Sequence, residues 1–430
     1  MMIQPRRLRA LVALSVLAWS GLAAAQPLHA AGPYPGADID LPTAIGLALA
    51  QPGVRAAAQE VAATEAAAGQ AGLYPNPELE YLREGQGSGS STTTVQINQP
   101  FELGGKRGAR RALAEEATAL AKGELAARRQ AVRSDVIAAY YTVLVGHERQ
   151  ALARSLTELA RQSVDVAAKR VLAGKISPID ETRARLAGVD ATTEFKHAAA
   201  DLAVARVRLG ALIGTPADAI VLASGQAAQL PEVGPLAQLL ARAGKAGAIQ
   251  RARSQLAVQE AQTKVERAAR IPDVRLSIGS QRDGEAGRRQ AVIGLSVPLP
   301  LFNRNQGNLS AALRRSDKAR DELAAAEVSV LAELTSAHTR YELAREEAVA
   351  LRQDVIPHAR SAYALTLKGF EYGKFSFLEV LDAQRSLFQV QARGWNAMLD
   401  AWRAYSDIER FVGDAHAGAQ AGPTESGSNQ

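Results

Sequence analysis

Apolar residues recur every three to four positions over two very long stretches of the chain. The first, residues 104–172, contains no proline and is dominated by residues that favour helix. Its apolar positions step by four or seven, which is the spacing of a coiled coil. The second, residues 303–372, is interrupted only by Pro357. At 1.5 Å per residue each stretch predicts a helix about 100 Å long, so we expect projecting rods rather than a compact core.

Each rod is expected to end in a tight turn that reverses the chain. Gly174 and Gly373 lie where a C′ glycine ends a helix, and Ser177 and Ser376 lie where an N-cap residue starts the next one. The returning helices are predicted over residues 178–214 and 377–412.

Four shorter segments alternate between apolar and polar or small residues, with a period of two. They are residues 78–84, 92–101, 273–281 and 289–299. This alternation predicts strands, and their length is that of strands in outer-membrane barrels. A solvent-facing hairpin on a soluble sheet has the same local pattern, so the segments alone leave both possibilities open.

Three short segments of the first half recur in the second half, 197, 198 and 199 residues further along the chain. The pairs are Pro75 with Pro272, Pro100 with Pro298, and Gly174 with Gly373. Three pairs in the same order indicate a duplication. We predict one repeat over residues 26–225 and a second over residues 226–414, each with a helix, two strands, a long helix and a returning helix.

The first 25 residues have the pattern of a signal peptide. Three arginines precede an uncharged run over residues 10–25, which ends in an Ala-x-Ala site at Ala23–Ala25. A membrane anchor is the alternative, although the run is short for a bilayer. No later run approaches 18 apolar residues, so any membrane crossing is expected to use strands. Residues 415–430, rich in Gly, Ser and Ala, are predicted to be disordered.

Composition narrows the class of protein further. Apolar residues make up 47% of the chain but aromatic residues only 5%, which suits close packing of small side chains between helices. Cysteine is absent, so we expect no disulfide, no thiolate metal site and no lipid-modified cysteine. The net charge of +6 includes the three arginines of the signal segment, which leaves +3 and weakens a nucleic-acid interpretation.

No constellation of residues predicts catalysis. The six histidines show no spacing typical of a metal site, and no nucleophile triad or nucleotide-binding loop stands out. We therefore expect no enzyme activity, no cofactor and no bound metal.

Four strands in one chain predict an oligomer. An open sheet cannot lie in lipid with bare edges. Two chains would close a barrel that side chains nearly fill, whereas three would close one wide enough for water. The predicted fold is therefore mostly α-helical with a membrane β-barrel, which two or three chains would close and which a tube of helices would continue.

Two segments carry a resemblance to a known family. Residues 369–384, Gly-Phe-Glu-Tyr-Gly-Lys-Phe-Ser-Phe-Leu-Glu-Val-Leu-Asp-Ala-Gln, resemble the periplasmic tip of the TolC-like outer-membrane factors. Residues 100–107, Pro-Phe-Glu-Leu-Gly-Gly-Lys-Arg, are similar to the heavy-metal-resistance branch, the CzcC-type proteins. The resemblance implies a homotrimer in the outer membrane, with a 12-stranded β-barrel continued by an α-helical barrel that extends into the periplasm. It also implies docking with a periplasmic adaptor and an inner-membrane RND pump, and export of heavy-metal cations.

The resemblance also implies an aperture at the tip. Glu379 and Asp382 match acidic positions that line the family's opening, although Glu379 also has the spacing of a capping-box acid. Asp180 and Arg183 are the equivalents in the first half.

The gate is expected to be latched differently from the family pattern. Phe370 and Lys374 occupy the positions of a tyrosine and an arginine that hold the family's tip closed. Phenylalanine has no hydroxyl, and lysine lacks the fork of arginine. We predict a latch from Lys175 or Lys374 to Asp180 or Asp382.

Two further surfaces are expected from the resemblance and the sequence. Adaptor contact is predicted at Gly174, Lys175, Tyr372 and Gly373. The membrane interface is predicted at Phe101, Lys106 and Arg107, where the two basic residues snorkel or hold the bend between strand and helix.

Other functions stay open at this stage. The same fold could serve drug efflux or type I protein secretion, since only residues 101–107 favour metals. A periplasmic coiled-coil scaffold would explain the rods but not the strand pairs.

Overall fold

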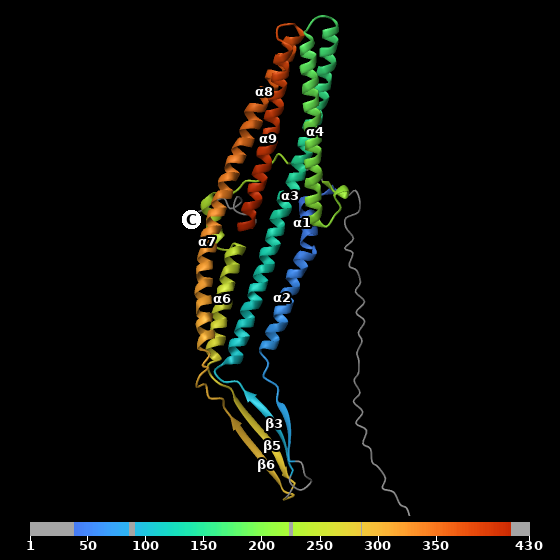
Figure 1. Cartoon of the computed structure of the whole chain (residues 1–430). Coiled ribbons are helices and arrows are strands. Elements are labelled where there is room, and N and C mark those ends of the chain that lie inside the picture. Colours follow the sequence, from blue (N-terminus) through green and yellow to red (C-terminus); the bar gives the residue numbers. More distant parts are fainter. Residues whose placement is uncertain (1–37, 86–90, 223–226, 285, 414–430) are drawn as a thin grey trace, which may run out of the picture.

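The protein is long and narrow, with a small sheet at one end and bundled helices over the rest (Figure 1). The computed structural model describes residues 38–85, 91–222, 227–284 and 286–413. The predicted signal peptide, residues 1–25, and the predicted tail, residues 415–430, lie outside the described residues.

The first half of the chain supplies two strands and the longest helix. In order, its elements are β1 (Asp38–Ile39), α1 (Leu41–Leu49), α2 (Pro52–Ala71), β2 (Glu78–Glu84), β3 (Thr92–Phe101), α3 (Lys106–Leu172), α4 (Pro178–Ile213), a short 3-10 turn (Ala217–Ala219) and β4 (Val221–Leu222). The 67 residues of α3 correspond to a rod of about 100 Å. β1 pairs in parallel with β4.

The second half follows with two more strands and a rod in two parts. Its elements are α5 (Leu236–Ala243), α6 (Gly247–Ala268), β5 (Val274–Asp283), β6 (Arg289–Ser296), α7 (Gln306–Ala350), a π turn (Leu351–Val355), α8 (Ile356–Glu371) and α9 (Phe377–Val412). A mostly helical chain with long helices and four antiparallel strands is what the sequence predicts. The division into two repeats stays a prediction.

Several element bounds differ from the predicted ones by a few residues, and proline explains two of the differences. The second rod is not one helix over residues 303–372, because a π turn ends just before Pro357, whose ring nitrogen cannot donate to the preceding turn. β6 ends at Ser296 rather than residue 299, because Pro298 and Pro300 lack the N–H that a ladder needs.

The helices are held together around the middle of the rods, where most large buried side chains lie. Tyr141 of α3 stacks on Trp402 of α9, and Leu334 and Tyr341 of α7 are fully buried nearby. Trp402 Nε1 donates to the carbonyl of Ala227 at 3.1 Å, and the Tyr341 hydroxyl donates to the carbonyl of Pro231. The segment between β4 and α5 is thus hydrogen-bonded to α7 and α9 and helps to hold these helices together.

The four strands form one antiparallel sheet in the order β2–β3–β5–β6. Each half of the chain supplies a hairpin, and β3 pairs with β5 to join them. β2 and β6 are left as edges of this sheet.

Candidate functional site

One face of the sheet is apolar and exposed. Its central row crosses all four strands and consists of Leu79, Ile97, Ile278 and Ile293. Each of these side chains is more than half exposed in the single chain. Phe101 lies on the same face at the helical end, in register with Val274. Large apolar side chains that face outward in a continuous patch indicate a surface covered by lipid or by another protein.

The opposite face of the sheet is polar. Glu80 accepts hydrogen bonds from the side-chain amides of Gln96 and Asn98, both at 2.7 Å. Ser277 Oγ donates to Asn98 Oδ1 at 2.5 Å, so the network links β2, β3 and β5. Asn98 is 3% exposed even in the single chain. A polar, hydrogen-bonded face behind an apolar one is the arrangement of a barrel wall with a wet interior.

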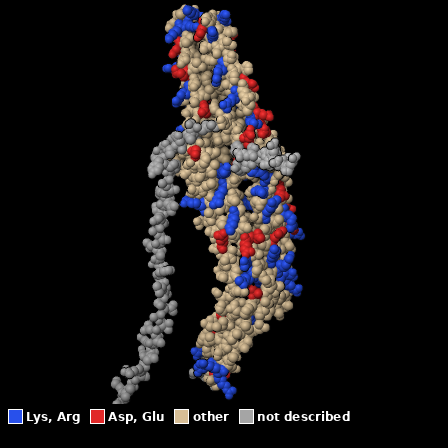
Figure 2. Space-filling model, turned by 180° about the vertical axis from the view of Figure 1, so that it is seen from behind, with Lys and Arg blue, Asp and Glu red and all other residues tan. Residues whose placement is uncertain are grey.

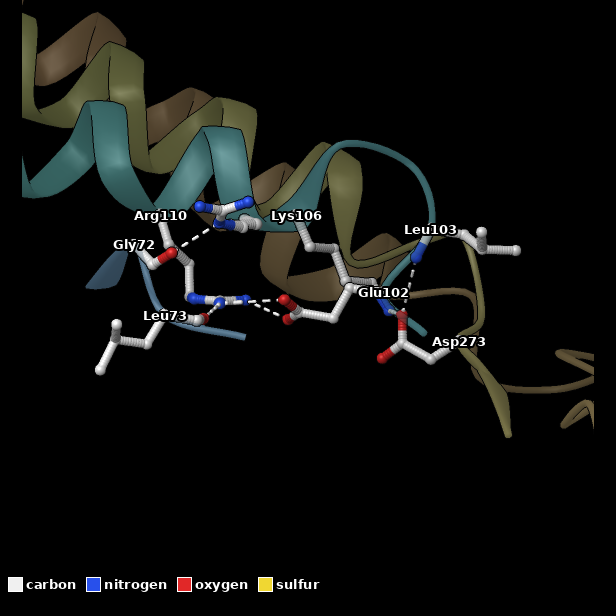
Figure 3. Close-up of polar contacts among 8 residues, drawn as sticks. Gly72, Leu73, Glu102, Leu103, Lys106, Arg110 and Asp273 are labelled. Atoms are coloured by element: carbon white, nitrogen blue, oxygen red, sulfur yellow. Dashed lines mark hydrogen bonds and ion pairs between the residues drawn. The ribbon is translucent and has the colours of Figure 1, made fainter. Parts of the chain in front are cut away.

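A tight bend joins the sheet to α3, and Lys106 fastens it (Figure 3). Gly104 and Gly105 both have positive φ, 70° and 73°. A Cβ on Gly104 would lie 2.8 Å from Ile271, so position 104 requires glycine for both reasons. Lys106 Nζ then reaches Asp273 Oδ1 at 2.7 Å, and the same oxygen accepts the N–H of Leu103 at 3.2 Å.

A second set of contacts fastens α3 to the segment after α2. Arg107 donates through Nε to the carbonyl of Gly72 at 2.5 Å, and its guanidinium stacks 3.9 Å over the Tyr74 ring. Arg110 makes two bonds to the carboxylate of Glu102 and one to the carbonyl of Leu73 (Figure 3). The Glu102 carboxylate raises the pKa of Arg110 above its usual value. These contacts are those needed to hold the bend between strand and helix.

Sequence reasoning missed Glu102, Arg110 and Asp273 as members of this junction. Glu102 was in view inside the motif at residues 100–107, but its partner lies eight positions on and across the bend. Asp273 is 167 residues from Lys106 in the chain, and no local pattern links the two.

The opposite end of the molecule is formed by two turns with closely similar geometry. Gly174 and Gly373 have positive φ, 65° and 72°. In each turn the N–H of the next residue donates back to a carbonyl of the preceding helix. The N–H of Lys175 donates to Arg170 O at 2.9 Å, and that of Lys374 donates to Gly369 O at 2.8 Å. Lys175, Lys374 and Tyr372 are exposed, and neither lysine forms an ion pair within the described residues. The predicted latch is therefore not closed inside a single chain.

The acidic residues of the tip fall into three different environments. Glu379 completes a capping box with Ser376, and the N–H and hydroxyl of Ser376 hold its pKa below the usual value. Asp180 pairs with Arg183 at 3.5 Å. Asp382 is exposed and forms no ion pair in the part of the chain that the structure describes.

Phe370 is a packing residue of the tip in the single chain. It is 5% exposed and contacts Phe377, with ring centroids 5.5 Å apart. Arg170 stacks 4.0 Å over its ring and donates to its carbonyl at 3.4 Å, which joins α3 to α8. Phe370 thus couples the two turns through packing.

A groove of about 700 Å³ lies below the tip, lined by α3, α4 and α9. Arg183 and Asp382 both line it, so the structure brings together these two predicted aperture residues. The groove is largely apolar, and Gln384, which also lines it, has a buried Oε1 without a hydrogen-bond partner among the described residues.

Neither a membrane-spanning helix nor a metal cluster is found in the described residues. No helix there combines the length and the apolar character needed to cross a bilayer. No group of three or more His, Asp or Glu there has a geometry that could hold a metal ion.

Comparison with known proteins identifies the family. The family model for the outer membrane efflux protein matches residues 45–215 and 241–414. The chain belongs to the outer membrane efflux protein family. Its sequence is 40% identical to the cobalt-zinc-cadmium resistance protein CzcC of Cupriavidus metallidurans over 389 residues, 90% of this chain and 92% of that protein. It is 30% identical to the nickel-cobalt-cadmium resistance protein NccC of Alcaligenes xylosoxydans xylosoxydans, over 72% of this chain and 70% of that protein.

Solved structures show the same fold. A membrane protein from Pseudomonas aeruginosa superposes with a TM-score of 0.76 at 23% identity, covering 87% of this chain and 90% of that one. The CusC channel superposes with a TM-score of 0.73 at 19% identity, covering 87% and 92%. The chain is therefore an outer-membrane efflux channel rather than an enzyme, from a TolC-like family whose members form trimers in tripartite efflux systems.

Proposed function

We propose that three copies of this chain form the outer-membrane exit duct of a tripartite system that exports heavy-metal cations. The observation that carries the metal assignment is the 40% identity to a cobalt-zinc-cadmium resistance protein over 90% of the chain. The partners are a periplasmic adaptor and an inner-membrane RND pump that supplies the energy. The chain itself is a passive conduit.

The sheet supports the trimer. β2 and β6 leave two unpaired edges, and an apolar outer face cannot lie in lipid beside bare backbone groups. Joining β6 of one chain to β2 of the next removes every edge. Three chains then supply 12 strands, with the exposed isoleucine and leucine row outside and the Glu80 network facing the lumen. Mass measurement in detergent that finds only monomer would contradict this assembly.

An export assay tests the metal assignment. The chain is expressed in a host without its own exit channel, together with the adaptor and pump of a metal-exporting system. We expect growth at several-fold higher Zn²⁺, Co²⁺ or Cd²⁺ than with an empty vector. Protection against drugs alone would replace the metal assignment with drug efflux, and protection against neither would refute the duct.

We further propose that Asp382 lines the aperture, with Asp180 and Arg183 beside it. Asp382 carries an exposed carboxylate with no ion pair in its own described chain, whereas the charge of Asp180 is offset by Arg183. Three copies around an axis would favour cations over anions in a narrow opening. Glu379 is held by its capping box, so its contribution is to the helix start and, through its charge, to the ring.

Planar-bilayer recording tests the aperture. Asp382→Asn should lower the cation-to-anion permeability ratio. Asp400→Asn, which removes an exposed acid 18 positions further along α9, should leave the ratio unchanged. Equal ratios in wild type and both variants would remove Asp382 from the pore.

We also propose the two tip turns as the adaptor-contact surface. Lys175, Tyr372 and Lys374 project from turns held by Gly174 and Gly373, so the backbone offers them in a fixed geometry. Lys175→Glu with Lys374→Glu should weaken adaptor cross-linking while the trimer mass in detergent stays unchanged. Unchanged cross-linking would place the contact elsewhere.

A further inference from the structure

Three arginines lie in one row across the far end of the sheet. The ladder aligns Arg83 of β2 with Thr93 of β3, Thr93 with Arg282 of β5, and Arg282 with Arg289 of β6. Residues aligned across a sheet point to the same face. All three arginines are exposed, and Lys and Arg gather visibly at this end of the molecule (Figure 2). We call this set the arginine row.

The arginine row is electrostatically unfavourable by itself. Arg282 and Arg289 are directly opposite each other on neighbouring strands, about 5 Å apart along the ladder. Like charges in that position destabilise a sheet. None of the three forms an ion pair within the described residues. Asp283 belongs to the next row and points to the other face, where its carboxylate accepts the N–H of Ala286.

The row lies where the apolar face ends. Counting along β5, Val274 and Arg282 share a face and are eight residues apart, which is about 27 Å of strand. At a strand tilt of about 40° this covers about 21 Å, close to the apolar band of outer-membrane strands, about 25 Å. Phe101 and Val274 mark one border of that band, and the arginine row marks the other.

We propose that the arginine row binds the phosphates of lipid headgroups in the outer leaflet. Arginine forks match phosphate oxygens in pairs, and a phosphate between neighbouring strands offsets the repulsion that the register creates. The row faces outward with the isoleucines rather than inward with Glu80, so the anion it meets is a lipid headgroup and not an ion in transit. This inference rests on the proposed function, because it requires the sheet to lie in the membrane.

The test uses the purified full-length trimer in neutral detergent, titrated with diphosphoryl lipid A while its thermal unfolding is followed. Arg282→Gln with Arg289→Gln should raise the lipid A concentration that gives half of the stabilisation by about 30-fold. This value multiplies a factor of about five for the loss of each arginine near an anionic surface. The control is Arg288→Gln, which removes a neighbouring arginine in the row of Asp283 on the opposite face. It should change the midpoint by less than about threefold.

A charge-preserving variant separates recognition from general attraction. Arg282→Lys with Arg289→Lys keeps both charges but removes the forks, so its midpoint should fall between those of wild type and the glutamine variant. Because the arginines are exposed, we expect all variants to fold. Circular dichroism and trimer mass confirm this before titration.

Each outcome has a distinct meaning. Equal weakening by Arg288→Gln would show unspecific charge attraction and overturn the site. Competition by inorganic phosphate as effective as lipid A would show a free-anion site and overturn the lipid assignment. A wild-type trimer that inserts and conducts in bilayers but gains no stability from lipid A would overturn the arginine row alone. A wild-type chain that does not insert would overturn the proposed function itself.

Discussion

Replacing Glu102 by glutamine tests whether the junction between sheet and rods is held by its buried carboxylate. The Glu102 side chain is only 11% exposed, and Arg110 donates two hydrogen bonds to its carboxylate. Glutamine keeps the shape but removes the charge and leaves one guanidinium donor facing an amide N–H. Breaking a fully buried pair costs about 3–5 kcal/mol. Because Arg110 is 35% exposed and reaches water, we expect a loss of about 2 kcal/mol in the free energy of unfolding.

The matched control is Glu115→Gln on α3, the helix that carries Arg110. Glu115 pairs with Arg111 at 2.8 Å, but the two side chains are 56% and 67% exposed. Its loss should cost less than about 0.5 kcal/mol. Urea unfolding in detergent, followed by far-UV circular dichroism at one protein concentration, measures both, and the denaturant slope should be unchanged. If the two variants differ by less than about 0.5 kcal/mol, the argument from burial is wrong.

Three further predictions concern the rods. Gly369→Ala should destabilise the tip by about 1–3 kcal/mol because the new Cβ would collide with the Phe375 ring. Its control, Gly188→Ala, places a Cβ 3.6 Å from the nearest atom and should stabilise the protein by about 0.5–1 kcal/mol. Equal shifts of the two variants in urea unfolding would contradict this. Leu334→Ala should cost about 2–5 kcal/mol in the same assay, since Leu334 is fully buried, and a smaller loss would show that the core closes over the gap. Burial, with a smaller effect from Arg206, lowers the pKa of His147. Neutral His147 therefore adds fully to the free energy of unfolding above about pH 6.5, and this stabilisation is lost as the pH falls toward the pKa of the folded state. The melting temperature of wild type should therefore drop more between pH 7.5 and 5.5 than that of His147→Gln, and parallel drops would refute it.

The sequence predicted those parts of the fold that depend on local chemistry. Each tip turn has a glycine that ends one helix and, three residues later, a serine that caps the next: Gly174 with Ser177, and Gly373 with Ser376. The helix boundaries could therefore be placed from these residues alone. Period-two alternation located the strands for the same reason. Pro357 was visible as an interruption and accounts for the break in the rod, but no local pattern specifies that the break takes the form of a π turn over Leu351–Val355.

Contacts between the two halves could not be predicted. The bond from Lys106 to Asp273 forms only when the two hairpins join, and the arginine row exists only once β2, β3, β5 and β6 adopt one register. Phe370 was considered for its missing hydroxyl, whereas its burial against Arg170 follows from the meeting of α3 and α8. Which residues face the axis of an assembly is decided by other copies of the chain, so the aperture stays a prediction.

The π turn at Leu351–Val355 gives the second rod a lever that the first rod lacks. Beyond it, the 16 residues of α8 extend about 24 Å to the tip turn, whereas α3 runs to the same end without interruption. A change of 10° at the π turn would displace Tyr372 and Lys374 by about 4 Å, while Lys175 would move only as far as the contact between Arg170 and Phe370 transmits the motion. Within each chain, we therefore expect the turn that ends α8 to move farther than the turn that ends α3. The bend that produces this motion lies far from the opening.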